Sequence, residues 1–170
     1  MTGAPAPGLP QLIERASGWY GERVAVVDGE RRLTFREVED RSNRLANALR
    51  ALAPGLGTRV ALLMANRLEF VEADFAIVKS GHVKLPINPR LVDREREYLL
   101  ASSGASILIV EAGFAAFVED AWPRLPTLET VIALDGPIAG ALDYVSLLEK
   151  GASTPPRIVP EEEAASFILY

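Results

Sequence analysis

Residues 59–87, RVALLMANRLEFVEADFAIVKSGHVKLPI, decide the fold class of this chain. Their opening part, Arg59 to Ala65, is almost continuously apolar, which is typical of a strand covered on both faces. A helical stripe follows and Gly81 ends it. The stripe consists of Leu68, Val71, Phe75 and Val78. A strand, a helix and a further strand in this order predict one unit of a parallel sheet.

The second strand of this unit has an alternating pattern. Its apolar positions are Val83, Leu85 and Ile87. Because proline cannot donate to a neighbouring strand, Pro86 must end this strand or leave it at an edge of the sheet. Ahead of the helix, Asn66 and Glu69 have the spacing of a second possible capping pair.

Downstream of this unit the alternation of helices and strands continues. The expected elements are a helix at about Asp93 to Ser102, a strand at Ser106 to Val110, a short helix around Phe117, a strand at Thr130 to Leu134 and a last short helix around Leu147. On the first of these helices we expect Tyr98, Leu99 and Leu100 to face inward. The pattern predicts an α/β fold with a mostly parallel, doubly wound sheet that carries helices on both faces.

Upstream of this unit, a short amphipathic helix from about Leu9 to Tyr20 precedes a hairpin. The hairpin joins Val24–Val27 to Arg31–Thr34 through an Asp28-Gly29 turn. Thr34 and Glu37 have capping-box spacing, so a helix should begin at Phe35. Glu37–Arg41 and Asp40–Arg44 place an acid four residues before a base, which predicts ion pairs on its solvent side.

Composition divides the chain into four parts. Residues 1–8 are a Pro- and Gly-rich, flexible lead-in rather than a signal peptide. Residues 9–150 form the α/β unit, and residues 151–163 are a linker by composition. Residues 164–170 begin a further strand. Since a domain rarely stops on an apolar strand, we expect the chain to be an incomplete part of a larger domain.

Charge and residue counts exclude several classes of function. The net charge is −5 and the pI is near 5.0, so no basic patch for a nucleic acid is expected. The weak basic cluster of Arg90, Arg94 and Arg96 alternates with acids and is interpreted as a solvated helix face. With no cysteine and one histidine, neither a disulfide scaffold nor a transition-metal site is expected. No run is long enough to span a membrane, and we expect a cytoplasmic protein.

Four stretches together resemble the acyl- and aryl-CoA synthetases of the adenylate-forming (AMP-binding) family. They are Leu33–Leu49 (LTFREVEDRSNRLANAL), Arg59–Val78, Lys79–Leu91 (KSGHVKLPINPRL) and the later SSGASILIV. Each is weak alone, but their order and spacing together are specific. Asn88 is similar to the CoA-ligase branch, whereas Thr58, Ala65, Ser80, His82 and Val92 depart from the family pattern. With Val92 where a capping Thr is common, Asp93 is expected to cap the helix instead.

The resemblance implies an enzyme of fatty-acid metabolism that joins a carboxylate to AMP and then passes the acyl group to coenzyme A. ATP, Mg²⁺ and coenzyme A are implied for this parent protein. In the family, a strand like Phe167–Tyr170 runs into a Ser/Thr/Gly-rich, lysine-containing phosphate loop, and this chain ends at Tyr170. We therefore assign no catalytic, cofactor-binding or metal residue to these 170 residues. They are expected to be inactive alone, with the remainder of the parent polypeptide as partner.

Residues that suggest chemistry have simpler structural interpretations. Gly55-Leu56-Gly57 precedes a strand rather than opening a helix, so phosphate binding there is not expected. His82 has no nearby Ser, Cys or paired acid and is interpreted as a strand residue. Lys84 is interpreted as a residue at the rim of the sheet. Glu161, Glu162 and Glu163 are interpreted as a solvated run. Trp19, Trp122 and Phe114 are interpreted as core or cover residues.

Two alternatives stay open. A contact from Arg94 or Arg96 to the nucleotide end of coenzyme A is one. The other is that the chain is a self-standing doubly wound module that binds a partner or small ligand without catalysis. Exposed strand edges, above all residues 166–170, also predict self-association.

Overall fold

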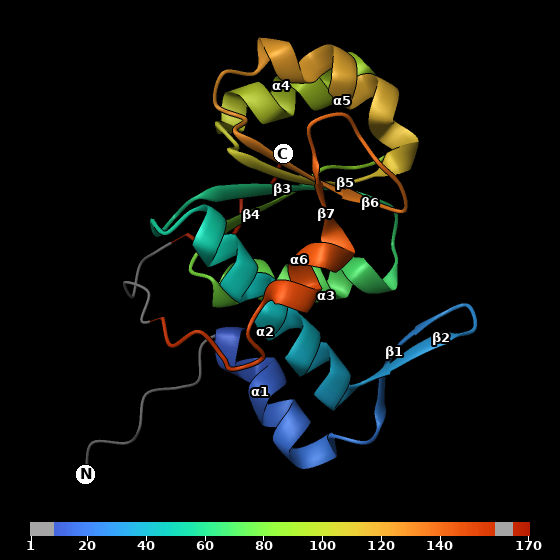
Figure 1. The fold of residues 1–170 in the computed structure, drawn as a ribbon, viewed down its shortest axis with the longest axis vertical. Helices are drawn as coiled ribbons and strands as arrows, with labels where there is room; N and C mark the ends of the chain where they lie inside the picture. Colours follow the sequence, from blue (N-terminus) through green and yellow to red (C-terminus); the bar gives the residue numbers. More distant parts are fainter. Residues whose placement is uncertain (1–8, 159–164) are drawn as a thin grey trace.

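A five-stranded parallel sheet separates two layers of helices in the computed structural model, which describes residues 9–158 and 165–170 (Figure 1). The strands are β3 (Arg59–Leu63), β4 (Val83–Pro86), β5 (Ile107–Glu111), β6 (Thr130–Leu134) and β7 (Leu142–Asp143), in the order β4-β3-β5-β6-β7. The helices are α1 (Leu9–Tyr20), α2 (Phe35–Leu52), α3 (Leu68–Lys79), α4 (Asp93–Ser103), α5 (Ala115–Ala121) and α6 (Tyr144–Lys150), with 3-10 turns η1 (Ala112–Phe114) and η2 (Trp122–Arg124). All pairings in this sheet are parallel, so the expected fold class is confirmed. No helix of the described residues is both long and apolar enough to cross a membrane.

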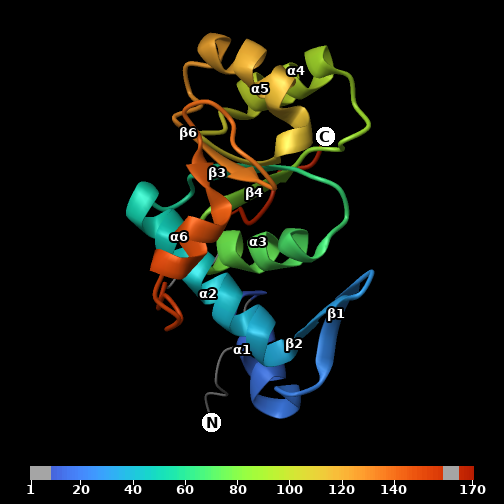
Figure 2. The ribbon, with the colours of Figure 1, turned by 45° about the vertical axis from the view of Figure 1, so that its right-hand side comes forward.

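Side chains that point alternately to the two faces of the sheet divide the buried core into two clusters. Ala61 and Leu63 of β3 face α4 and α5, whereas Val60 and Leu62 face α2, α3 and α6. Because successive side chains of a strand point to opposite faces, a continuously apolar strand supplies both layers. Figures 1 and 2 show α4 and α5 on one side of the sheet and α2, α3 and α6 on the other.

An antiparallel hairpin of β1 (Val24–Asp28) and β2 (Arg31–Thr34) precedes the sheet and stands apart from it (Figure 2). Its two-residue connection is Gly29-Glu30, one position later than expected, because Asp28 still pairs with Arg31; Gly29 has φ +60°. The capping box at the start of α2 is confirmed. The backbone N–H of Thr34 donates to Glu37 at 2.7 Å, and that of Glu37 donates to Oγ1 of Thr34 at 3.2 Å.

The N-terminus of α3 is capped by a distant residue instead of a neighbour. Arg67 is the N-cap position and its side chain makes no capping bond, so the predicted Asn66–Glu69 pair is wrong. The backbone N–H of Leu68 donates instead to Oδ2 of Asp28 on the hairpin, at 3.3 Å. A tertiary contact thus supplies what a local cap would have supplied.

The buried face of α3 is also different from the predicted stripe. Of the four stripe residues only Leu68 is fully buried, while Val71, Phe75 and Val78 are half-buried. The buried positions include Glu69, Glu72, Ala73, Ala76, Ile77 and Lys79. The pattern failed because α3 packs against α2 through charged side chains, which hydrophobic periodicity treats as solvent-facing.

Two other expectations about aromatic residues are wrong. Tyr98 is 64% exposed, although Leu99 and Leu100 are buried against the sheet as expected. Three consecutive helical residues point about 100° apart, so they cannot all face one surface. Trp19 is 67% exposed and lies beneath the guanidinium of Arg15, 5.0 Å from its ring centre.

Beyond α6, the chain runs back along α2. The side-chain amide of Asn47 donates to the carbonyls of Ala152 and Thr154, both at 2.8 Å, and that of Asn43 donates to Ser153 at 2.9 Å. A Cβ on Gly151 would lie 2.1 Å from the carbonyl oxygen of Arg44, so only glycine fits this close approach. The α2 helix therefore holds residues 151–154 in place.

Candidate functional site

The carboxyl edge of the sheet is where ligands bind in open α/β folds, at the point where the strand order reverses. Here the chain passes from β3 to β4 in one direction and then crosses back to β5 on the other side of β3. The reversal lies between the carboxyl ends of β3 and β5. The residues that follow these two strands therefore line the expected ligand-binding position.

Arg67 occupies this reversal point. Its Nε donates to Oε2 of Glu69 at 2.6 Å, its Nη1 to Oε1 of Glu111 at 3.3 Å and its Nη2 to Oδ1 of Asp135 at 3.1 Å. Hydrogen bonds to Asp135 and Glu69 raise the pKa of Arg67, and its side chain is only 15% exposed. One guanidinium thus fastens the ends of β3, β5 and β6 together.

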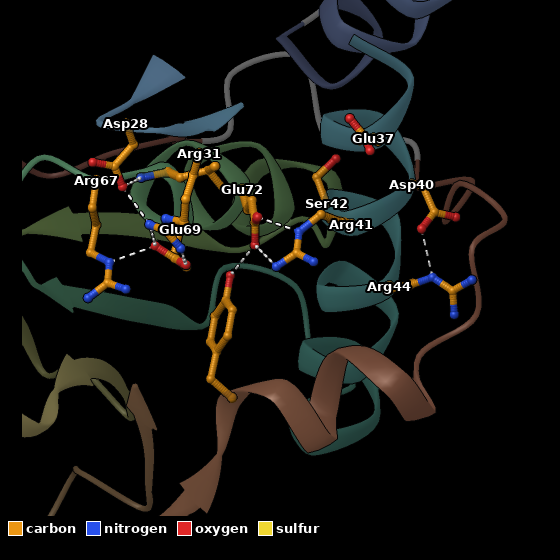
Figure 3. Close-up of polar contacts among 12 residues, drawn as sticks. Asp28, Arg31, Glu37, Asp40, Arg41, Ser42, Arg44, Arg67, Glu69 and Glu72 are labelled. Atoms are coloured by element: carbon orange, nitrogen blue, oxygen red, sulfur yellow. Dashed lines mark hydrogen bonds and ion pairs between the residues drawn. The ribbon is translucent and has the colours of Figure 1, made fainter. Parts of the chain in front are cut away.

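Glu69 joins this reversal point to the hairpin (Figure 3). Arg31 donates to its two carboxylate oxygens at 2.6 and 3.1 Å, and Arg31 also pairs with Asp28. Burial by itself would raise the pKa of Glu69, but the hydrogen bonds from Arg31 and Arg67 outweigh it and hold that pKa at about 2. The carboxylate is therefore ionised at neutral pH and serves as an anchor for the hairpin.

A second buried carboxylate, Glu72, lies one turn further along α3. Arg41 of α2 donates to it from Nε and, at 3.2 Å, from Nη2, and the hydroxyl of Tyr144 on α6 donates to its Oε2 at 3.0 Å. The predicted Arg41–Glu37 pair on the solvent side of α2 is therefore wrong, whereas Asp40–Arg44 forms at 2.8 Å. Burial raises the pKa of Glu72, with Arg41 and Tyr144 opposing it, and burial followed by Glu72 raises the pKa of Tyr144.

An open groove of about 740 Å³ lies beside β4, between α4 and the end of the chain. It is lined by Pro86, Asn88, Leu91, Val92, Arg94, Glu95, Tyr98, Leu99 and Tyr170. The hydroxyl of Tyr170 lies 2.9 Å from Oγ of Ser102 on α4. The lining is mostly apolar, with a few polar groups at the rim, which suits a small organic ligand or an apolar segment of polypeptide.

The arginines that were grouped together in the sequence separate in the structure. Arg94 is exposed at the rim of the groove. Arg96 is not on a solvated face, because its Nη2 donates to the carbonyl of Pro89 at 2.7 Å and its guanidinium lies 4.7 Å from the ring centre of Phe114. At the start of α4, Val92 rather than Asp93 is the N-cap residue, and its N–H donates to the carboxylate of Glu95 at 3.1 Å.

The remaining sequence candidates lie away from the carboxyl edge. His82 is buried just before β4, and burial lowers its pKa. Lys84 pairs with Asp74 of α3. The N–H of Gly57 donates to the carbonyl of Gly81 at 2.8 Å. Glu161, Glu162 and Glu163 lie outside the described residues.

Sequence reasoning missed two hydrogen-bonded groups, Arg67 with Glu69 and Glu72 with Tyr144. The signal that was available was two glutamates three residues apart in a mostly apolar helix, which place two carboxylates on one face. Within residues 9–158 and 165–170, no group of three or more His, Asp or Glu side chains is arranged to hold a metal ion.

Comparison with known proteins identifies the family. The family model described as AMP-binding enzyme matches residues 13–170. A 3-oxocholest-4-en-26-oate–CoA ligase of Rhodococcus rhodochrous is 30% identical over 97% of this chain and 31% of its own length. A long-chain-fatty-acid–CoA ligase of Thermus thermophilus is 34% identical over 92% of this chain and 29% of its own. The chain thus spans about a third of the length of these relatives.

Solved structures agree with this match. The anthranilate CoA ligase AuaEII, in complex with anthranoyl-AMP, superposes with a TM-score of 0.90 and 29% identity over 98% of this chain and 33% of that one. The N-terminal domain of FACL13 from Mycobacterium tuberculosis gives a TM-score of 0.87 and 26% identity over 97% of this chain and 42% of that one. The resemblance inferred from the sequence motifs is confirmed, and the chain belongs to the AMP-binding enzyme family.

Proposed function

We propose that this chain is the N-terminal scaffold of an ATP-dependent acyl-CoA ligase. Such an enzyme forms an acyl-AMP and pyrophosphate from a carboxylate and ATP, and the thiol of coenzyme A then displaces AMP to give the acyl-CoA. The observation that carries the proposal is the family match, which extends to Tyr170, together with the course of the last residues. Phe167 forms a parallel bridge with Lys84, so the chain runs beside β4 towards the carboxyl edge of the sheet.

The charges at this edge support a scaffold rather than a complete catalytic centre. Transfer of AMP needs free cationic groups and backbone donors around the phosphates. Arg67, at the reversal point, is saturated by three carboxylates. The sequence holds no Ser/Thr/Gly-rich loop followed by lysine. The residues described here therefore do not fit the phosphates of ATP, and we propose that these 170 residues carry out no ligase reaction by themselves.

The role proposed for Arg67, Glu69 and Glu72 is to position the strand ends and the hairpin. Arg67 and Glu69 link the ends of β3, β5 and β6 to the hairpin, while Glu72 links α3 to α2 and α6. The names of the relatives, which include ligases for fatty, steroid and aromatic acids, define the panel to be assayed.

Two measurements test the proposal. The purified chain is incubated with ATP, Mg²⁺, coenzyme A and a panel of fatty, steroid and aromatic acids, and AMP and pyrophosphate are quantified. No formation above background is expected. A preparation of the Leu62→Asp variant, whose core is disrupted, serves as the control, because a contaminating host ligase would give the same signal in both. Turnover present in the native chain and absent from this control would disprove inactivity.

The coding sequence beyond codon 170 tests the parent assignment independently. A Ser/Thr/Gly-rich segment followed by lysine is expected. A stop codon, or continuation into a different kind of sequence, would favour the alternative of a self-standing module.

A further inference from the structure

Residues 151–154, here called the strap, follow α6 and run beside α2 (Figure 1). Their sequence, GAST, offers little apolar surface to bury, so packing alone cannot hold them. Each of the four carbonyl groups instead accepts a hydrogen bond from α2. The carbonyl of Gly151 accepts from Arg44 at 3.2 Å, those of Ala152 and Thr154 from Asn47 at 2.8 Å, and that of Ser153 from Asn43 at 2.9 Å.

The side-chain amide of Asn43 is held in one orientation. Its Nδ2 donates to the carbonyl of Ser153 at 2.9 Å and to Oε1 of Glu39 at 3.0 Å. Its Oδ1 accepts from Nζ of Lys79 at 2.7 Å. A flipped amide would place Nδ2 against the ammonium and Oδ1 against two acceptors, so all three hydrogen bonds would be lost.

Lys79, at the end of α3, supplies the donor that distinguishes the two orientations. Its side chain is 3% exposed, and its Nζ also donates to Glu39 at 2.6 Å and to Oγ of Ser42 at 2.9 Å. The three N–H groups of the ammonium thus meet three acceptors, all of them on α2. Buried ion pairs contribute little net stability compared with apolar side chains of similar volume, and their best-attested use is to select one arrangement among alternatives.

We propose that Lys79 is a positioning residue: its ammonium orients the Asn43 amide, and the amide in turn fixes the strap on α2. Without the ammonium, Oδ1 of Asn43 loses its donor and the amide is free to turn away from Ser153. The conformation of the strap therefore depends on a residue of α3 whose hydrogen bonds all go to α2. Residues 151–154 then belong to the α/β unit, although their composition is that of a linker.

NMR of the isotope-labelled chain tests the proposal. In the native chain the side-chain amide protons of Asn43 should exchange with solvent more slowly than those of the exposed Asn66. The ¹⁵N order parameters of residues 152–154 should equal those of α2. Lys79→Met keeps the aliphatic stem but removes the ammonium. It should accelerate exchange of the Asn43 amide protons about tenfold, the effect of one lost buried hydrogen bond, and lower the order parameters of residues 152–154.

A double-mutant cycle tests whether Lys79 acts through Asn43. In an Asn43→Ala background, Lys79→Met should make the strap no more mobile than Asn43→Ala does alone. In an Asn47→Ala background the two effects should add, because Asn47 holds the strap through its own hydrogen bonds. Lys150→Met is the matched control, since it removes an exposed lysine directly before the strap and should leave the strap rigid.

Lys79→Met leaves the Glu39 carboxylate without its cation, so thermal unfolding must show that the variant is folded. Combining Lys79→Met with Glu39→Gln removes both charges and repeats the test without an uncompensated carboxylate. Unchanged exchange of the Asn43 amide in both variants, or a strap that stays rigid in both, would overturn the proposal. An effect of Lys79→Met that is equally large in the Asn43→Ala background would overturn it as well.

Discussion

Helices α4 and α5 pack on one face of the sheet almost entirely through apolar side chains, whereas α2 and α3 on the other face also bury charged groups. Glu72 is fully buried between α3, α2 and α6. Lys79 is 3% exposed and donates to Glu39, Ser42 and Asn43 at 2.6, 2.9 and 2.7 Å.

The two faces should therefore respond differently to substitution. An apolar layer loses stability in proportion to the volume removed. A layer with buried ion pairs loses most stability when one partner of a pair is removed, because the other charge is then left buried without compensation. Four variants test this contrast, from the largest expected effect to the smallest.

The largest loss of stability is expected for Arg41→Met, because this change leaves the Glu72 carboxylate buried without its cation. The free energy of unfolding in urea should fall by about 4 kcal/mol at pH 7. The loss should shrink between pH 7 and pH 4, because burial raises the pKa of Glu72 and the orphaned carboxyl then takes up a proton.

Two controls accompany this variant. Adding Glu72→Gln should recover more than half of the loss, since the glutamine still accepts from Tyr144 and carries no charge. Arg36→Met breaks an exposed pair with Glu22 and should cost less than about 1 kcal/mol. If Arg41→Met and Arg36→Met lowered the free energy of unfolding equally, the buried carboxylate of Glu72 would not be the cause of the loss of stability.

On the other side of the contrast, Leu108→Ala of β5 removes a fully buried side chain beneath α4 and α5. Its cost should be about 3 kcal/mol, from lost burial and the remaining cavity. Urea unfolding at pH 4 and pH 7 should give the same difference from the native chain. A strong pH dependence would contradict a purely apolar layer.

A smaller effect is expected at His82, which is buried at the border of the charged layer. Burial lowers its pKa, the nearby backbone of Leu49 opposes this, and Arg50 of α2 lowers it further. Because the folded state prefers the neutral imidazole, its contribution to stability is complete above the unfolded pKa near 6.5 and is lost as pH falls towards the folded pKa.

The measurement is the pH slope of the unfolding free energy between pH 7.5 and pH 5. His82→Phe should reduce this slope by at most one proton, which is about 1.4 kcal/mol per pH unit. An unchanged slope would mean that His82 has the same pKa in both states.

The smallest effect is expected for Thr34→Ala, which removes the side-chain cap of α2. It should cost about 1 kcal/mol, because a cap satisfies one backbone donor at an exposed helix end. Thr34→Ser keeps the hydroxyl and should lie within a few tenths of a kcal/mol of the native chain. A loss as large as that of Arg41→Met would show that the local cap, rather than the buried pair, holds α2.

Local signals were enough to predict most elements. Helix α1, the start of α2 at Phe35 and strand β6 lie where the periodicity, the capping box and the apolar run place them. Each depends on neighbours in the chain, because a cap spans three residues and a strand shows its own alternation. Strand β7 was missed, since two exposed residues carry no pattern.

The candidate site was not predictable in the same way. Arg67 follows β3 and contacts residues at the ends of β5 and β6, which only the sheet order brings together. Glu37 lies one turn from Arg41 and is the closer partner in sequence, but it accepts from Thr34, while Arg41 reaches Glu72 across the α2–α3 interface.

The sequence by itself determined an α/β chain with a parallel sheet and a membership of the AMP-binding enzymes, because periodicity and motif order are local or collinear properties. Only the tertiary structure decided which charges are buried and which strand ends Arg67 joins at the carboxyl edge of the sheet. The physical reason is that the free energy of a charge depends on the groups around it in space, and those groups come from segments that the sequence separates.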